Sequence, residues 1–313
     1  MLNFMRSPRA TASADDQRRV APWRRAGVEH EKSEVRFDFY EKIDMLVDEE
    51  GEIVEVSLYG DIIAAIKISG TPVFYMGLNE PDVMKDNRLA GHSVALDIIS
   101  YHESIARDLY KGQKVIKFVP PDDSFQLLKY FVSDAPPVIP MWITATERIV
   151  PDTRKIVYHV KLESRFPEEI KFCDVTRKLE AIKVSVRIPV LKGATDATFH
   201  IGYVLAEHCG MRTTFSPEQS EVKWDTSVFP AKSSAELKIT LNLPREEQPE
   251  KRDRLPVTLN YYIPRYSLSG LKPVNVTYHE HFLTVCPRKT AQFSLGFRTT
   301  STHHGCQFKI KQL

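Results

Sequence analysis

The amino-acid sequence predicts an all-β protein made of sandwiches of antiparallel sheets. The first observation behind this prediction is a period of two in the apolar residues, which is typical of strands with one face in a core and one in water. Four runs of the 313-residue chain show it: residues 54–58, 182–188, 237–243 and 257–263. The second observation is that prolines and glycines lie between such runs, for example at residues 70–72 and 136–137, where they favour turns. Many short strands separated by turns are the pattern of β-sandwiches.

The segment over residues 94–109 departs from this pattern. Its apolar residues recur at intervals of three and four: Val94, Ile98, Tyr101, Ile105 and Leu109. That spacing alone predicts an amphipathic helix.

The N-terminal residues 1–32 carry the excess charge of the chain. They hold seven Lys and Arg against four Asp and Glu, a net +3, whereas the whole chain has 43 basic and 41 acidic residues, a net +2. With almost no periodic apolar pattern, residues 1–32 are predicted to be a disordered basic tail or linker. Trp23 beside Arg24 and Arg25 gives an alternative, a weak attraction to anionic lipid. The near-balance elsewhere argues against nucleic acid as a partner, because phosphate binding needs a concentrated basic face.

Motifs of catalysis and of metal binding are not evident in the sequence. It contains no GxGxxG, GxxxxGKS/T or GxSxG, so neither a phosphate-binding loop nor a nucleophile elbow is predicted. The best metal candidates are His279 and His281 with Cys286, and His303 and His304 with Cys306. A structural zinc site needs about four ligands, which this spacing does not supply. We therefore expect neither an enzyme nor a cofactor.

The chain is expected to stay in the cytoplasm. No apolar run approaches the roughly 20 residues that span a bilayer, and Arg6, Pro8 and Arg9 interrupt any signal-peptide core. The cysteines are far apart and form no CxxC pair: Cys173, Cys209, Cys286 and Cys306. Without a secretory signal they are interpreted as reduced thiols.

Three stretches, in order along the chain, carry a family resemblance. They begin with EVRFDFYEKID at residue 34, VIKFVPPDDSFQLLKYFV at residue 115 and IPRYSLSGLKP at residue 263. Together they resemble the mu homology domain of the adaptor-complex medium chains, the cargo-reading subunits of vesicle coats. Within that family, EKID at residues 41–44, AAIKISG at 64–70 and TFSPEQSEVKWD at 214–225 are most similar to the medium chain of adaptor protein complex 3. A full medium chain of this family begins with a longin-type domain, and we expect no counterpart of it before residue 33.

The resemblance implies an elongated molecule of two β-sandwich subdomains, the second inserted into the first. The first is expected over residues 33–150 and 256–313, and the insert over residues 151–255. It also implies a strand and loop over residues 94–109 in place of the helix. The implied partners are the cytosolic tails of membrane cargo, other adaptor-complex subunits and a phosphoinositide-bearing membrane surface. The implied location is peripheral, on Golgi, endosomal or coated-vesicle membranes.

The resemblance further implies a site for tyrosine-based signals, Y-x-x-φ, where φ is a bulky aliphatic residue. Its tyrosine pocket would consist of Asp38, Arg298, Arg36 and Lys67, and its aliphatic pocket of Phe37, Pro273, Val276 and Phe297. Asp38 would accept the phenolic hydrogen, and Arg298 would donate to the phenolic oxygen. Arg36 and Gly296 stand where the family has aromatic walls. The alternative is therefore a mu-type scaffold with a degenerate pocket that binds folded partners.

Overall fold

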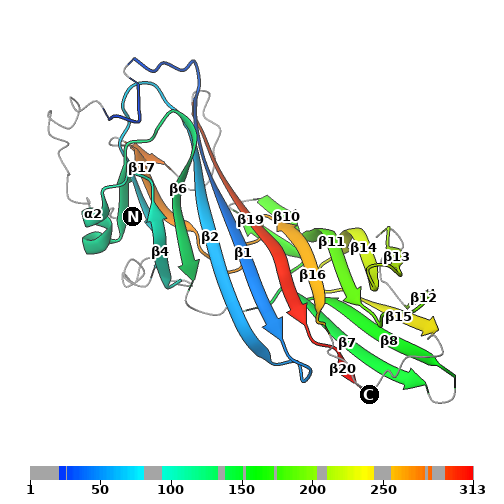
Figure 1. Ribbon diagram of the computed structural model, residues 1–313. Helices are drawn as coiled ribbons and strands as arrows, with labels where there is room; N and C mark the ends of the chain where they lie inside the picture. The colour runs from blue at the N-terminus through cyan, green and yellow to red at the C-terminus, as the bar shows by residue number, and fades with distance from the viewer. Residues whose placement is uncertain are drawn as a thin grey trace, which may run out of the picture.

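The computed structural model describes residues 21–25, 27–80, 94–132, 138–150, 153–172, 175–202, 210–242, 255–278, 281–283 and 293–312. Within these ranges the molecule is elongated and almost entirely β (Figure 1). The predicted all-β fold is confirmed.

One nine-stranded sheet runs along the length of the molecule. Its strands, in spatial order, are β13 (Arg212–Ser216), β14 (Glu221–Pro230), β11 (Glu180–Pro189), β16 (Val257–Pro264), β19 (Phe293–Phe308), β1 (Ser33–Val47), β2 (Ile53–Lys67), β6 (Asp123–Val132) and β4 (Leu96–Tyr101). Neighbours are antiparallel except β1 and β19, which are parallel. A parallel pair in the middle of this sheet joins chain segments about 260 residues apart, as Ser33 pairs with Phe293.

Two smaller sheets complete the sandwiches. A four-stranded sheet consists of β18 (His281–Leu283), β17 (Pro273–Tyr278), β3 (Phe74–Leu78) and β5 (Val115–Phe118). A five-stranded sheet consists of β12 (Asp196–Ile201), β15 (Ser234–Asn242), β8 (Lys155–Ser164), β7 (Met141–Val150) and β20 (Lys311–Gln312). Strands β9 (Glu169–Phe172) and β10 (Val175–Lys178) pair with each other. Ring contacts between Phe37 and Phe118, and between Trp142 and Phe308, connect the large sheet to each of the smaller ones.

The second sandwich begins earlier than the sequence-based boundary at residue 150. Strand β7 pairs along its whole length with β8, so it belongs to the five-stranded sheet. The end of the chain returns to the same sheet, because Lys311 of β20 pairs with Thr146 of β7. The nine-stranded sheet also passes through both halves, so the two subdomains share a sheet and are not separate modules.

The prediction of a helix over residues 94–109, made from the apolar spacing, is wrong for most of that segment. Residues Leu96–Tyr101 form β4, which pairs with β6, and the short helix α2 begins only at Arg107 and ends at Gln113. The register shifts between Ile98 and Ser100. A bulge inserts one residue into the alternation, so apolar residues three apart reach the same face of a strand. The strand and loop implied by the family resemblance are what the structure shows.

The tail predicted over residues 1–32 does not extend to residue 32. Residues 1–20 and 26 lie outside the described residues, but Arg24 is only 3% exposed. Its guanidinium donates to the backbone carbonyls of Ile68, Gly70 (2.7 Å from Nε) and Pro120 (3.1 Å from Nη1). Trp23 Nε1 donates to the carbonyl of Val119 at 2.8 Å. The Arg24 side chain is therefore held by hydrogen bonds to backbone carbonyls, and the segment from residue 21 packs on the first sandwich.

A buried carboxylate ties β1 to the loop before β17. Glu41, 2% exposed, accepts hydrogen bonds from the backbone N–H groups of Leu268 (2.5 Å) and Ser269 (3.2 Å) and from the hydroxyl of Tyr130 (3.2 Å). Burial raises the pKa of Glu41, and its hydrogen bonds act in the opposite direction. Gly60 lies between Glu41 and Tyr130 in the pairing of β1, β2 and β6, so the tyrosine ring can cross over it to reach the carboxylate.

Candidate functional site

Strands β1 and β19 bring together the segments that the sequence assigns to the signal site. In their parallel register Asp38 pairs with Arg298, and Phe37 pairs with Phe297. The side chains of residues 293–305 lie outside the described residues, so this statement concerns the backbone of Arg298 and Phe297. Paired residues of neighbouring strands present their side chains to the same face of a sheet. The backbone thus places the predicted carboxylate and guanidinium positions next to each other.

Asp38 lies on the outer face of the large sheet but is only 4% exposed. Its Oδ2 atom accepts a hydrogen bond from Nε of Arg36 at 3.0 Å. Arg36 is partly exposed, and its Nη1 also lies 3.7 Å from Oε1 of Glu34. The structure therefore joins two of the predicted tyrosine-pocket residues in a charge-assisted pair, which is stronger than a neutral hydrogen bond.

Lys67 is not brought to Asp38. It ends β2 opposite Glu34, whereas Ile63 is the residue of β2 opposite Asp38. Four residues along a strand correspond to roughly 13 Å. Lys67 is exposed at the far end of the same face and lies away from the Asp38–Arg36 pair.

Three residues predicted for the aliphatic pocket have described side chains, and all three are buried in the first sandwich: Phe37, Pro273 and Val276. Phe37 and Val276 are completely buried, and Pro273 is buried as well. Phe37 contacts Phe118 edge to face, with ring centroids 6.5 Å apart, and Val276 pairs with Met76. In this structure the four-residue set, as far as its side chains are described, is sealed and presents no open socket.

Beside these positions, over residues 293–299, one edge of strand β19 is free of any pairing neighbour among the described strands. Residues 300–308 pair with β16 on one side and with β1 on the other, and Figure 1 shows β16 alongside this part only. Over residues 293–299 β1 is the single pairing neighbour among the described strands. A strand with an unpaired row of N–H and C=O groups is a template for a further strand.

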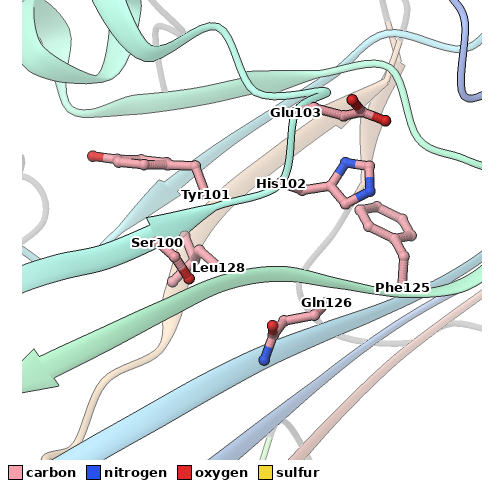
Figure 2. Close-up of a pocket in the computed structure, with 7 residues that line it drawn as sticks. All are labelled: Ser100, Tyr101, His102, Glu103, Phe125, Gln126 and Leu128. Atoms are coloured by element: carbon pink, nitrogen blue, oxygen red, sulfur yellow. The ribbon is translucent and has the colours of Figure 1, made fainter.

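A hollow between β4 and β6 was not predicted from the sequence. It measures about 460 Å³ and is lined by Ser100, Tyr101, His102, Glu103, Phe125, Gln126 and Leu128 (Figure 2). The hollow lies where β4 ends and the chain turns away from β6. Its residues come from two segments that lie apart in the sequence. Because the apolar spacing predicts a helix for the first of these segments, its pairing with β6 was not expected.

The ring of His102 is fixed at one end of this hollow. Figure 2 shows it beside Phe125, with ring centroids 4.9 Å apart, and Tyr101 at the other end. The backbone N–H of Ser104 donates to Nδ1 of His102 at 3.1 Å, so the neutral ring carries its proton on Nε2. Burial lowers the pKa of His102, which favours this neutral form.

Metal and membrane-spanning features do not emerge from the part of the chain that the structure describes. There, no three His, Cys, Asp or Glu residues gather as metal ligands, and no helix is long and apolar enough to cross a bilayer. Of the zinc candidates, His279 and Cys286 lie outside the described residues, as do the side chains of His281, His303 and His304. Cys306 is a buried thiol.

The model of the adaptor complexes medium subunit family matches residues 21–302, so this chain belongs to that family. The family consists of subunits of vesicle-coat adaptors and is non-enzymatic. The prediction that the protein is not an enzyme is therefore confirmed.

Two relatives are medium chains of the AP-1 complex. AP-1 complex subunit mu-1-I of Caenorhabditis elegans is 26% identical over 277 residues, which cover 87% of this chain and 59% of the relative. AP-1 complex subunit mu-1 of Schizosaccharomyces pombe is 23% identical over 296 residues, which cover 93% and 63%. The chain thus spans about three fifths of the length of these relatives. The expected similarity to the adaptor protein complex 3 medium chain in particular is not confirmed by them.

Solved structures share the fold. The yeast delta-COP-I mu-homology domain superposes with a TM-score of 0.58 at 16% identity, covering 90% of this chain and 99% of that one. A chain of a homology model of the full-length AP-3 complex gives 0.55 at 15% identity, covering 89% and 68%. The fold is therefore that of a mu homology domain.

Proposed function

We propose that this domain is the cargo-recognition part of a vesicle-coat adaptor and binds Y-x-x-φ signals in the cytosolic tails of membrane proteins. The observation that carries the proposal is the parallel register of β1 and β19 beside a free edge. It sets Asp38 next to the Arg298 position, and residues 293–299 have a pairing neighbour on one side among the described strands.

The backbone of the signal would add to the free edge of β19 as an extended strand. Main-chain hydrogen bonds would hold any extended segment, so specificity must come from the side-chain pockets. The tyrosine ring would lie over Arg36, whose guanidinium can stack on an aromatic face. Its hydroxyl would donate to Asp38 and accept from Arg298.

A phosphorylated signal should be rejected. Phosphotyrosine carries nearly two negative charges, and the Asp38 carboxylate is already buried at 4% exposure. Arg36 already pairs with this carboxylate, with its Nε atom 3.0 Å from Oδ2 of Asp38. A second anionic group at this place would be opposed by repulsion and by loss of hydration.

The aliphatic φ residue needs a rearrangement of the core, since Phe37 and Val276 have no exposed surface. It would have to enter between the two sheets beside the free end of β19. Burial of a leucine there is worth about 2 kcal/mol, which has to exceed the cost of opening the core. We therefore expect a modest affinity, with Kd of about 1 µM or weaker, and capture on membranes through several simultaneous contacts.

The test is a fluorescence titration with a labelled Y-x-x-φ peptide, its phosphotyrosine form and its Tyr-to-Ala form. We expect only the unmodified peptide to bind, and Asp38→Ala to weaken it at least tenfold. Asp44→Ala is the matched control, because Asp44 lies on the same face of β1 and pairs with Lys42 at 2.9 Å. Unchanged affinity in Asp38→Ala would show that the site is assigned wrongly.

A second candidate function is a mu-type scaffold that has lost its peptide pocket. The complete burial of Phe37 and Val276 favours it, together with Gly296 in place of an aromatic wall. This function predicts that the unmodified protein binds no Y-x-x-φ peptide at concentrations up to about 1 mM. A Kd of about 1 mM corresponds to about 4 kcal/mol of binding free energy. Failure of the wild-type protein in the titration would select it.

The cellular setting follows from the same proposal. The chain would act with other adaptor-complex subunits, peripherally on Golgi, endosomal or coated-vesicle membranes. Contact with phosphoinositides is part of this proposal, as is membership of adaptor protein complex 3, which the motifs at residues 41–44, 64–70 and 214–225 favour. Reconstitution with the remaining subunits of each complex would decide between the adaptors.

A further inference from the structure

Strand β12 forms one edge of the five-stranded sheet, at the end of the molecule that lies far from α2 (Figure 1). It pairs with β15 over Asp196–Ile201 in an unbroken register, and among the described strands none pairs with its other side. Its six residues include no Lys and no Pro, which commonly protect a sheet edge from further pairing. Ile201 is 37% exposed. Strand β12 is therefore an edge that can accept a further strand.

The free edge of β12 presents the backbone groups of alternate residues. The N–H of Gly202, directly after β12, donates to the carbonyl of Glu236 on β15 at 2.8 Å. In an antiparallel ladder, residues whose N–H and C=O groups face one neighbouring strand alternate with residues whose groups face away from it. Counting back from Gly202, the even-numbered residues of β12 face β15. The N–H and C=O groups of Ala197, Phe199 and Ile201 therefore face the free edge.

The side chains of β12 also alternate between two faces of the sheet. Ala197 and Phe199 are partly buried and pack against the hydrophobic core. Asp196, Thr198 and His200 are exposed on the opposite face. This exposed row carries a carboxylate at one end and an imidazole at the other, with the small polar Thr198 between them.

These features make β12 complementary to a second copy of itself. Two-fold symmetry sets the two strands antiparallel, and hydrogen bonds form only when residues that face the free edge lie opposite one another. This condition holds when Ala197 lies opposite Phe199 of the second copy, so that a small side chain adjoins a large one. Asp196 of each copy then lies opposite His200 of the other, in a non-hydrogen-bonded pair with Cα atoms only about 4.5 Å apart.

The charged residues select this register among those with the same hydrogen-bonding pattern. The two neighbouring registers place Asp196 opposite Gly202 or opposite Thr198, and both lose the Asp–His pairs. An imidazole donates an N–H to a carboxylate whether the ring is neutral or protonated. Opposite partners of this kind directly across two strands stabilise the pairing, and like charges at the same positions destabilise it.

Lys238 of β15 adds to the attraction for a carboxylate at His200. It pairs with His200 and is exposed on the same face of the sheet. It lies two strand spacings, about 10 Å, from the Asp196 position of a second copy. Glu236 is exposed as well, but it lies beyond His200, opposite Gly202. The face around His200 is thus complementary in charge to Asp196.

We infer that the free edge of β12 is a homodimerisation surface, at which two copies of this chain join their five-stranded sheets through antiparallel β12 strands. The paired segment is short, so the interface is small and the dimer should be weak. The proposed signal site lies on β1 and β19 of the nine-stranded sheet, whereas β12 belongs to the five-stranded sheet. The dimer therefore does not depend on a working tyrosine pocket.

The experiment is sedimentation-velocity ultracentrifugation of the full chain over about 5–500 µM, a range suited to small interfaces. His200→Asp places two carboxylates opposite each other in both pairs. Combining His200→Asp with Asp196→His exchanges the two partners and re-forms the pairs. His159→Asp is the matched control, because exposed His159 of β8 lies in the same cross-strand row, beyond Lys238 and two strands from the edge. Circular dichroism melting verifies that each variant is folded.

Ala197→Pro tests the main-chain pairing separately from the charges. Proline is tolerated on an edge strand where the N–H group points away from the neighbouring strand, which is the case at Ala197. The monomer should therefore stay folded, while the dimer loses hydrogen bonds at both symmetry-related positions. In the wild-type protein, amide hydrogen exchange at Phe199 should slow as the protein concentration rises.

We expect the wild-type protein to show a reversible monomer–dimer equilibrium. His200→Asp and Ala197→Pro should each raise the dimer Kd by about tenfold or more, because repulsion or lost hydrogen bonds occur twice in the symmetric interface. The charge-exchange variant should return to within about threefold of the wild-type Kd, and His159→Asp should match the wild type.

Three results would overturn the inference. A wild-type protein that stays monomeric at about 500 µM would exclude even a weak dimer of this kind. A dimer that survives both His200→Asp and Ala197→Pro in folded proteins would use another surface. A folded charge-exchange variant that associates no better than His200→Asp would refute the register in which Asp196 meets His200. Failure of the Y-x-x-φ titration has no bearing on these measurements.

Discussion

Substitution of Gly60 by alanine should be among the most destabilising single changes in the first sandwich. A Cβ atom built on Gly60 would lie 2.0 Å from Cζ and 2.4 Å from Oη of Tyr130. The ring has to leave its place over β2, and the hydrogen bond from Tyr130 to Glu41, 3.2 Å long, is lost with it. Overpacking costs about 1–3 kcal/mol, and a hydrogen bond to a charged group contributes about 1.5–3 kcal/mol. We expect a loss of roughly 3–5 kcal/mol in the free energy of unfolding.

The assay is urea denaturation followed by tryptophan fluorescence and circular dichroism. Gly112→Ala is the matched control, because a Cβ atom on Gly112 in α2 meets nothing within 4 Å. It should be neutral or stabilising by up to about 1 kcal/mol. In a Tyr130→Leu background the cost of Gly60→Ala should fall below about 1 kcal/mol, since the clash is removed. A cost below about 1 kcal/mol in the wild type, or an equal cost in both backgrounds, would refute the reasoning.

Two further predictions concern buried charges. Arg24→Met should lower the free energy of unfolding by about 2–4 kcal/mol, because the carbonyls of Ile68, Gly70 and Pro120 lose a charged donor. Amide hydrogen exchange near residue 70 should become faster. The control Arg25→Met, at an exposed neighbour, should change the free energy of unfolding by no more than about 0.5 kcal/mol, and equal effects of the two substitutions would contradict the docking of this segment. Burial raises the pKa of Glu41, so the folded state holds its proton to higher pH than the unfolded state. The stability advantage of the wild type over Glu41→Gln should therefore shrink as pH rises from about 4 through the raised pKa, and a difference that grows over this window in paired urea titrations would contradict the direction of the shift.

The sequence was sufficient for the strands whose two faces differ. The apolar residues alternate in the sequence over residues 182–188 and 237–243. Residues 182–188 lie in β11 and residues 237–242 in β15, and both strands hold buried apolar residues. It was insufficient at β4, because the bulge between Ile98 and Ser100 changes an alternating pattern into one that resembles a helix. Local periodicity contains no information about an extra residue in a strand, which only the partner strand reveals.

The docked N-terminal segment was missed for a different reason. The Arg24 guanidinium donates hydrogen bonds to backbone carbonyls, at residues 68, 70 and 120. Carbonyls are present at every position, so no side-chain pattern announces such a partner. The same limit applied to the signal site. The family resemblance assigned Asp38 and Arg298 to the proposed site, and β1 and β19 pair these two positions. Burial of Phe37 and the distance of Lys67 depend on packing and register that the sequence does not display.

The structure links the stability of β1 to the geometry of the proposed signal site through the register of that strand. Side chains alternate along a strand, so a slip of one residue would turn Phe37 outward and Asp38 into the core. Glu41 prevents this slip, because its carboxylate is bonded on the inner face to Tyr130 across Gly60 and to the backbone of Leu268 and Ser269. Glu41 lies three positions after Asp38, an odd offset, so fixing Glu41 inward fixes Asp38 outward, next to the Arg298 position of β19. A buried network with no ligand contact thus determines which face of the sheet carries the acidic group.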